Sequence, residues 1–333
     1  MTLIDDPRSD APTQAVPPVP PPAPGAVPPA MPPVPPRLRG RRPGRAPVTR
    51  APRAGRWWGG AALLSLSLLL LGFITHVTVF SSIQHDRAQS LQYEELRSSL
   101  AKAETPVGQL DLDKKLVAAG TPVALLQIPR LGIEEVVGEG TTSDLLRSGP
   151  GHQRSSVMPG QNGTAVILGR QTTYGAPFAD LKRLVPGDTI TVTTGQGTHT
   201  FTVSGLRRDG DDKLPIPGEG EGRLELVTAD GLPLFPSGAL HVDAELTSPT
   251  VETPTRVMSV EALPAEERAM GHDGSAWFTA FFAGTFLLAA IAGMTALWLR
   301  WRRGPAWIIG VPVVVTLAAA TADAVMNALP NLL

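Results

Sequence analysis

The sequence contains no cysteine among its 333 residues. This absence excludes disulfide bonds, thiolate metal sites and any reaction that begins with attack by a thiol. The chain also lacks an excess of charge of either sign, because its formal net charge is -1. No basic surface for nucleic acid is therefore expected in its folded part. We predict no metal, no other cofactor and no nucleic-acid partner.

Large apolar residues are scarce at the N-terminal end, where proline is abundant. We interpret residues 1–56 as a disordered, Pro/Arg-rich cytoplasmic tail, because the run PPVPPPAPGAVPPAMPPVPP favours polyproline II and cannot build a core. A ligand for a proline-binding module is the alternative interpretation. A cluster of arginines directly before an apolar run is typical of a membrane-topology signal, and this cluster consists of Arg37, Arg39, Arg41, Arg42, Arg45, Arg50, Arg53 and Arg56.

Three apolar runs are candidates for transmembrane helices: residues 57–80, 276–299 and 306–325. The first would extend ~36 Å at a rise of 1.5 Å per residue, and its long leader argues against a cleaved signal peptide. Basic residues precede the first run and also fill the loop at 300–303, and both clusters favour the cytoplasmic side. The sequence thus predicts a multi-pass protein of the cell membrane with a cytoplasmic N-terminus and an extracytoplasmic region after the first span.

The third apolar run contains two residues that are unusual in a membrane helix. Pro312 is expected to kink the helix or to make the segment re-entrant. Asp323 lies near the predicted outer end of the run, and an ionised carboxylate is costly in hydrocarbon. Two interpretations of Asp323 stay open: exposure at the membrane surface and contact with another helix.

The region between the first two spans divides into three parts. Residues 81–120 predict a juxtamembrane helix or stalk, residues 121–247 a β domain, and residues 248–275 a polar linker. Short helical turns are expected at Ser143–Arg147 and Ala179–Leu184. The predicted strands are rich in Val, Ile, Leu and Thr and are separated by glycine-containing turns; they are Val123–Pro129, Glu134–Gly138, Thr164–Leu168, Thr189–Thr194, Thr198–Gly205, Leu224–Thr228 and Leu240–Leu246. So many short strands in one domain favour a closed barrel or a sandwich.

Two stretches of this domain, LLQIPRLGIEEVVGEGTTSDLLRSGPGH and MPGQNGTAVILGRQTTYGAPFADLKRLVPGDTITV, resemble the sortase family, in particular its class E-like actinobacterial members. The resemblance implies an all-β fold, a sortase-like closed β-barrel of about eight strands with short helices, in addition to the transmembrane α-helices. For a complete member it also implies cleavage of a sorting signal such as LPxTG by a Cys. A His then serves in acid/base work, and an Arg stabilises the developing oxyanion.

None of these three catalytic residues stands at the position that the resemblance assigns to it. The His position falls on Arg170, the Cys position falls on Ala229, and residues 237–242 of the last strand contain no Arg. No other His, and no other Arg or Lys, lies close enough in the sequence for a small shift in alignment to restore the missing residue. We therefore predict no catalytic residues and a degenerate member of the family.

The leading hypothesis is a membrane-anchored, catalytically inactive sortase-like protein that acts as a binding or scaffold module of the cell envelope. Arg170 would attract a carboxylate, and the candidate groove residues are Arg170, Thr172, Tyr174, Thr228 and Asp230. The expected partners are the membrane and either a sorting-signal-bearing or other envelope protein or a catalytic sortase. Two alternatives stay open: an active sortase-type transpeptidase or cysteine-independent peptidase, and a membrane assembly factor that works through the C-terminal spans.

Overall fold

The computed structural model describes residues 17–18, 54–233, 235–300 and 303–333. The tail predicted for residues 1–56, with most of its arginine cluster, therefore lies almost wholly outside the described residues. Two residues of the predicted basic loop, Trp301 and Arg302, also lie outside them.

A long helical run precedes the barrel. Helix α1 (Ala54–Thr75), the π-helical segment η1 (His76–Phe80) and helix α2 (Ser81–Lys102) follow one another without a break. The predicted first span and the helix expected after it are thus parts of one run, which ends where Ala103 takes a left-handed conformation with a φ of 57°. A π-helical turn changes the direction in which nearby side chains point, and η1 is the segment that carries His76.

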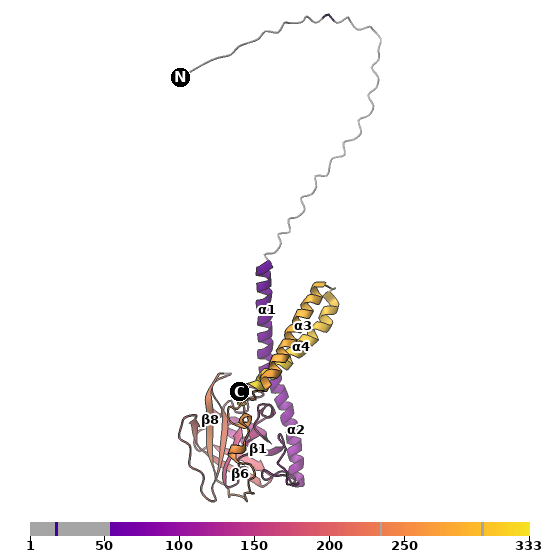
Figure 1. Ribbon diagram of the computed structural model, residues 1–333. Coiled ribbons are helices and arrows are strands. Elements are labelled where there is room, and N and C mark those ends of the chain that lie inside the picture. The colour runs from indigo at the N-terminus through magenta and orange to yellow at the C-terminus, as the bar shows by residue number, and fades with distance from the viewer. Residues whose placement is uncertain (1–16, 19–53, 234, 301–302) are drawn as a thin grey trace, which may run out of the picture. The chain divides into compact units, whose positions relative to one another are not determined.

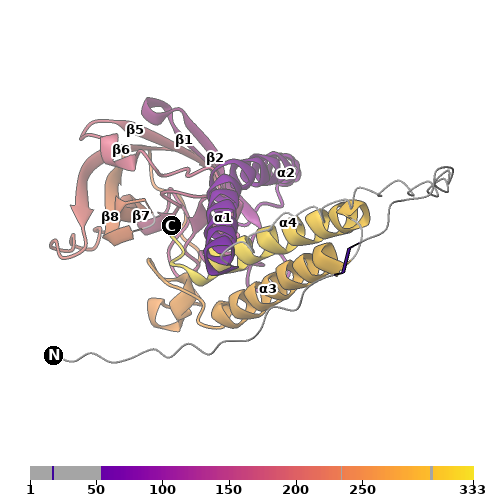
Figure 2. The ribbon, with the colours of Figure 1, turned by 90° about the horizontal axis from the view of Figure 1, so that it is seen from above.

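Helices α3 (Ala276–Arg300) and α4 (Arg303–Ala328) pack side by side (Figures 1 and 2). Together with the first run they give, within the described residues, three helices that are long and apolar enough to cross a membrane. Membrane association is thereby supported, while the direction in which each helix crosses stays a prediction. Helix α4 continues through Pro312, so this proline does not interrupt the third apolar segment.

Eight strands form a closed barrel in the order β1–β2–β3–β4–β7–β8–β6–β5, and several of them are labelled in Figure 1. The predicted fold class is confirmed. The strands are β1 (Pro122–Ile128), β2 (Ile133–Glu139), β3 (Gly151–His152), β4 (Gly163–Leu168), β5 (Thr189–Thr194), β6 (Gly197–Arg208), β7 (Gly222–Leu232) and β8 (Phe235–Leu246). The sequence does not predict β3, because a strand of two residues has no alternation to recognise. Short 3-10 turns at Leu145–Arg147 and Leu181–Arg183 lie within the two predicted helical turns.

Alternation along the strands separates the interior of the barrel from its outer face. On β6, Phe201 and Val203 are buried in the core. The alternate residues Thr200 and Thr202 are only partly buried, as expected where successive side chains point to opposite faces. Strands β7 and β8 likewise send every second side chain into the core, with Leu224, Leu226, Leu240, Val242 and Ala244 inside. The remaining side chains of β7 and β8 therefore lie on the outer face, which carries the candidate site.

Candidate functional site

The parallel pair β4–β7 brings Arg170 and Ala229 to the same end of two adjacent strands. Leu168 is in register with Val227, and the main-chain N–H of Gly169 donates to the Val227 carbonyl over 3.0 Å. Arg170 lies two residues after Leu168, and Ala229 lies two residues after Val227. The positions that the resemblance assigns to the His and the Cys are thus neighbours in the fold, but they hold a guanidinium and a methyl group.

Ala229 belongs to an apolar patch on the outer face of the barrel. Its partner on β8 is Ala239, which lies in the stretch where the resemblance assigns an Arg. Both alanines are buried, and we define the outer-face patch by Leu146, Leu168, Val227, Ala229 and Ala239. These five side chains are all hydrocarbon, so they offer neither a nucleophile nor a proton donor.

The segment Leu329–Leu333, which follows α4, covers the outer-face patch. The side chains of Leu332 and Leu333 are buried in the same cluster as the patch. The Gln171 N–H donates to the Leu332 carbonyl over 2.9 Å, and the Thr173 hydroxyl donates to the main-chain oxygen of Leu333 over 2.6 Å. Figure 1 shows this end of the chain beside the barrel. The region predicted as a groove is thus occupied by the chain itself.

Arg170 is fully buried beside this segment. Its guanidinium donates to the carbonyl and the hydroxyl of Ser143 over 2.6 and 2.9 Å, to the Thr173 hydroxyl over 3.1 Å and to the main-chain oxygen of Leu333 over 3.0 Å. No side-chain carboxylate of a described residue forms an ion pair with it. Burial lowers the pKa of Arg170 to about 10, so the group still carries its charge at neutral pH.

Tyr174 and Asp323 join the barrel to the helices. The Tyr174 hydroxyl donates to Asp323 Oδ1 over 3.0 Å, and His76 Nε2 lies 2.9 Å from the same oxygen. The guanidinium carbons of Arg147 and Arg170 lie 4.9 and 5.0 Å from the centroid of the Tyr174 ring, within cation–π range. Burial raises the pKa of Tyr174 to about 12, so the phenol keeps its proton. Of the two interpretations of Asp323, the structure supports contact with another helix.

The remaining candidate groove residues do not line one open surface with Arg170 and Tyr174. Thr228 is buried, and its hydroxyl has no hydrogen-bond partner among the described residues. The Thr172 hydroxyl is also without a partner within this part of the chain. Asp230 pairs with Arg208 over 2.9 Å. Since a threonine hydroxyl needs a base to become a nucleophile, the surroundings of Thr228 do not supply an activated group.

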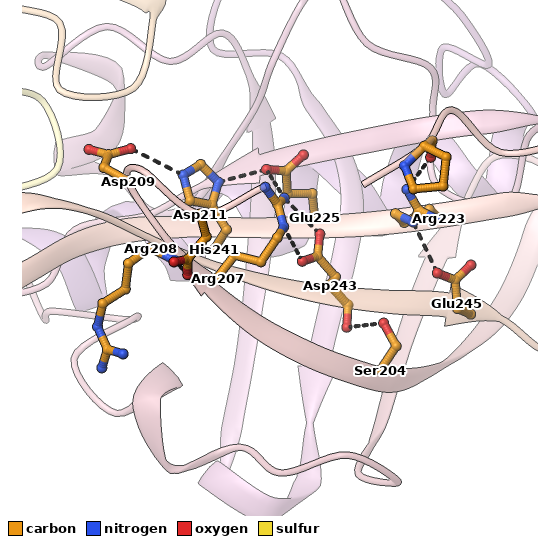
Figure 3. Close-up of polar contacts among 11 residues, drawn as sticks. Ser204, Arg207, Arg208, Asp209, Asp211, Arg223, Glu225, His241, Asp243 and Glu245 are labelled. Atoms are coloured by element: carbon orange, nitrogen blue, oxygen red, sulfur yellow. Dashed lines mark hydrogen bonds and ion pairs between the residues drawn. The ribbon is translucent and has the colours of Figure 1, made fainter. Parts of the chain in front are cut away.

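A charged cluster lies further along the outer face of β6, β7 and β8 (Figure 3), and the sequence analysis did not single it out. Arg207 contacts Asp243 over 2.6 Å and Glu225 over 3.0 Å. His241 Nδ1 lies 2.6 Å from Glu225, and its Nε2 lies 3.6 Å from Asp209. The sequence signal that would have revealed this cluster is charge at every second position of a strand, as at 241 and 243.

The contacts within this charged cluster shift pKa values in complementary directions. The hydrogen bond to Asp243 raises the pKa of Arg207, and the hydrogen bond to Glu225 raises the pKa of His241. Burial alone would raise the pKa of Glu225, but His241 and Arg207 together lower it. The cluster thus places an imidazole and a guanidinium near the outer-face patch, and carboxylates already engage both. Among the described residues, no group of three or more His, Asp or Glu side chains is arranged to hold a metal.

His152 is buried on β3 and uses both ring nitrogens. Its Nδ1 lies 2.8 Å from Glu139 Oε2, and its Nε2 lies 2.9 Å from the Val157 carbonyl. Burial alone would lower the pKa of His152, but the Glu139 carboxylate reverses this and raises it. A buried histidine held by two contacts in this way is part of the framework of the barrel.

A cavity of about 310 Å³ borders Ser143, the residue that accepts two hydrogen bonds from Arg170. The residues that line it include Asp144, Glu266 and Asp273. Neither Arg170 nor Ala229 contributes to the lining, so the cavity is distinct from the outer-face patch.

Known proteins that are similar to this chain in sequence or in structure are sortases. Residues 126–234 match the family model described as "Sortase domain". Over 84 residues the chain is 30% identical to Sortase D of Bacillus subtilis, a match that covers 25% of this chain and 41% of that protein. Over 154 residues it is 26% identical to Sortase SrtE1 of Streptomyces coelicolor, with 44% of this chain and 42% of that protein covered. The chain thus spans about two fifths of the length of these relatives.

Solved structures with a similar fold include sortase E from Streptomyces avermitilis, at 29% identity and a TM-score of 0.34, covering 45% of this chain and 99% of that one. They also include the Sortase D5 transpeptidase of Clostridium perfringens, at 22% identity and a TM-score of 0.41, covering 49% and 99%. The closed eight-stranded barrel and the family match together define a sortase domain. The chain belongs to the sortase family and is class E-like.

Proposed function

We propose that this chain is a membrane-anchored, catalytically inactive member of the sortase family that acts as a binding or scaffold module of the cell envelope. The observation that carries the proposal is the pair Ala229–Ala239 in the outer-face patch, in a chain without cysteine. Acyl transfer requires a nucleophile, a proton donor and a stabiliser of negative charge. The outer-face patch offers no nucleophile, and Arg170 cannot act as a base because its guanidinium stays protonated at neutral pH.

The surroundings of Thr228 weigh against the alternative of a cysteine-independent enzyme. Its hydroxyl contacts no base among the described residues, and the nearest acidic candidate in the sequence, Asp230, is already paired with Arg208. A partner is bound without being cleaved in this proposal, and Arg170 supplies a cation for a carboxylate of that partner. The expected partners are a sorting-signal-bearing or other envelope protein, or a catalytic sortase.

The test uses the full chain in lipid nanodiscs with a fluorogenic sorting-signal peptide, and a complete sortase as positive control. We expect no turnover above the protein-free rate, and no change with Thr228→Ala. Photo-crosslinking of the full chain in its native membrane is expected to capture a specific envelope protein. Turnover that Thr228→Ala abolishes would overturn the proposal, as would crosslinking that captures no envelope protein.

A second candidate function, a membrane assembly factor, is favoured by the contact of Asp323 with His76. This carboxylate lies on α4 and joins the first helical run to Tyr174 of the barrel. Polar contacts between membrane helices hold them in a fixed arrangement, typically with about 1 kcal/mol per contact. In this function the helices would bind the partner and the barrel would serve as a spacer.

Replacement of the helix contact separates the two functions. His76→Phe removes the partner of Asp323 on the first run and leaves the outer-face patch and its cover unchanged. If α3 and α4 recruit the partner, His76→Phe is expected to reduce its capture by crosslinking severalfold. Unchanged capture would exclude this second function and leave the binding function of the barrel in place.

A further inference from the structure

The segment Leu329–Leu333 is held by more than apolar contact with the outer-face patch. Asn331 is fully buried. Its side-chain amide donates to the carbonyls of Thr141, Arg268 and Glu266 over 2.7, 3.0 and 3.3 Å, and its main-chain N–H donates to the Gly271 carbonyl over 2.8 Å. One asparagine therefore anchors the middle of the segment through four hydrogen bonds.

The barrel binds this segment as proteins bind peptides, with main-chain hydrogen bonds for affinity and apolar contacts for specificity. The main-chain oxygens of Leu332 and Leu333 accept from Gln171, Arg170 and Thr173. The two leucine side chains pack against the outer-face patch. These contacts would serve a separate peptide of similar sequence equally well.

Some polar atoms beside the segment remain unused. Arg170 Nε, Gln171 Oε1 and Thr172 Oγ1 are buried without a hydrogen-bond partner among the described residues. Buried polar atoms in folded proteins are paired in the great majority of cases. Three consecutive residues with unpaired polar atoms indicate that the segment does not satisfy all the hydrogen-bonding capacity of this site.

We propose that Leu329–Leu333 is an intramolecular ligand of the outer-face patch and must leave before another peptide binds there. The inference rests on the proposed binding function and names what keeps that site closed. A tethered ligand acts at an effective concentration on the order of millimolar, so a free peptide with the same contacts does not displace it at micromolar concentration. The segment follows directly on α4, and Ser143 Oγ donates to the Met326 carbonyl at the end of that helix over 3.3 Å.

The absence of native cysteine allows a direct test in the full chain in nanodiscs. A single cysteine introduced by Leu333→Cys reports whether the segment is seated, since Leu333 is 2% exposed. Ile216→Cys is the exposed reference at 91%. We expect the thiol at 333 to react with a maleimide at least about tenfold more slowly than the thiol at 216, a ratio that corresponds to ~1.4 kcal/mol of protection.

Asn331→Asp is the variant that releases the segment without altering the outer-face patch. It is nearly isosteric, but it faces three carbonyl oxygens with a carboxylate in place of a donor. The matched control is Asn162→Asp, at a half-buried residue whose side-chain amide donates to a single carbonyl. We expect Asn331→Asp to raise the reactivity of the thiol at 333 by about tenfold and Asn162→Asp to leave it unchanged.

A fluorescent peptide of residues 328–333, ALPNLL, is the binding probe. It is expected to bind the Asn331→Asp chain and not the unmodified chain, and a control peptide with Leu332→Asp and Leu333→Asp is expected to bind neither. A thiol at 333 that reacts as fast as the thiol at 216 overturns the inference. Equal binding of the probe to both chains, or to neither, also overturns it. If crosslinking still captures an envelope protein in those cases, the proposed binding function survives.

Discussion

Two arginines on this barrel meet opposite surroundings. Arg207, in the charged cluster on the outer face, contacts the carboxylates of Asp243 and Glu225, and the hydrogen bond to Asp243 raises its pKa. Arg170, beside the outer-face patch, is fully buried and donates only to hydroxyl and main-chain oxygens. Burial lowers its pKa to about 10. Arg207 thus contacts two side-chain carboxylates, whereas Arg170 contacts hydroxyl groups and main-chain oxygens, one of them on Leu333.

This difference assigns Arg207 to the framework of the barrel, and it supports the proposal that Arg170 binds a ligand. Burial of a charge is costly unless an opposite charge compensates it. Arg207 meets that requirement within the barrel, and its role is complete without a ligand. Arg170 does not meet it with the described side chains, and it stands where the resemblance assigns a catalytic histidine. A guanidinium that already donates to an oxygen of Leu333 is suited to bind an oxygen of a ligand in the same way.

Replacement of Arg207 is expected to have the largest effect on stability. Arg207→Met leaves the buried Asp243 carboxylate without its cation, and breaking a buried ion pair from one side costs about 3 kcal/mol. The measurement is thermal unfolding of the barrel followed by circular dichroism in detergent. Arg183→Met, at an exposed pair with Asp180, is the control and should cost below about 0.5 kcal/mol. Equal effects of the two variants would contradict the structural role of Arg207.

Replacement of Arg170 is expected to have a smaller effect on stability and a larger one on the covering segment. In Arg170→Met the lost hydrogen bonds are partly offset by removal of a buried charge, so we expect a loss of about 1 kcal/mol. The oxygen of Leu333 also loses its donor, and the thiol of Leu333→Cys should then react severalfold faster. A loss as large as that of Arg207→Met would show that Arg170 is compensated as fully as Arg207.

The smallest expected effect is a pH dependence that arises in the charged cluster. Glu225 holds the pKa of His241 above its usual value of 6.5. Asp209 also faces the imidazole, while the nearby Arg207 opposes the shift. Because its pKa is raised in the folded state, protonation of His241 adds to the free energy of unfolding. This contribution is complete below pH 6.5 and is lost as the pH rises through the raised pKa. The midpoint of thermal unfolding should therefore fall from pH 6 to pH 8.

His241→Gln isolates this contribution from that of His152, whose pKa is also raised. The variant should show a shallower fall of the midpoint over the same range than the unmodified chain. An identical pH profile for the two proteins would show that His241 does not cause the pH dependence of the unfolding midpoint. Glu225 does not contribute to the change between pH 6 and pH 8, because its pKa is lowered and it therefore titrates at more acid pH.

Much of the barrel could be predicted because strand patterns are local. The alternation in β6 and the apolar runs of β4 and β7 reflect side chains that face one core, and each pattern is visible in a few consecutive residues. The absence of cysteine was also visible, since it does not depend on the fold. The two-residue strand β3 and the full extent of β7 and β8 were missed, because turns and bulges at their ends interrupt the pattern.

The candidate site could be predicted only in part. The sequence placed Arg170 and Ala229 in the site, and the register of β4 with β7 brings the two positions together. It did not indicate that Arg170 and Tyr174 are buried, because the groups that bury them come from distant parts of the chain. The charged cluster was missed for a related reason, as its members lie on three strands and none is unusual alone.

The sequence by itself determined the class of fold, the three apolar helices and the lack of a thiol, because each follows from the type and spacing of nearby residues. Only the tertiary structure decided that Leu329–Leu333 lies on the outer-face patch and that Asp323 contacts His76 and Tyr174. The physical reason is that these contacts join residues about 90 to 250 positions apart, and only the packing of α4 and the segment after it against the rest of the chain brings them together.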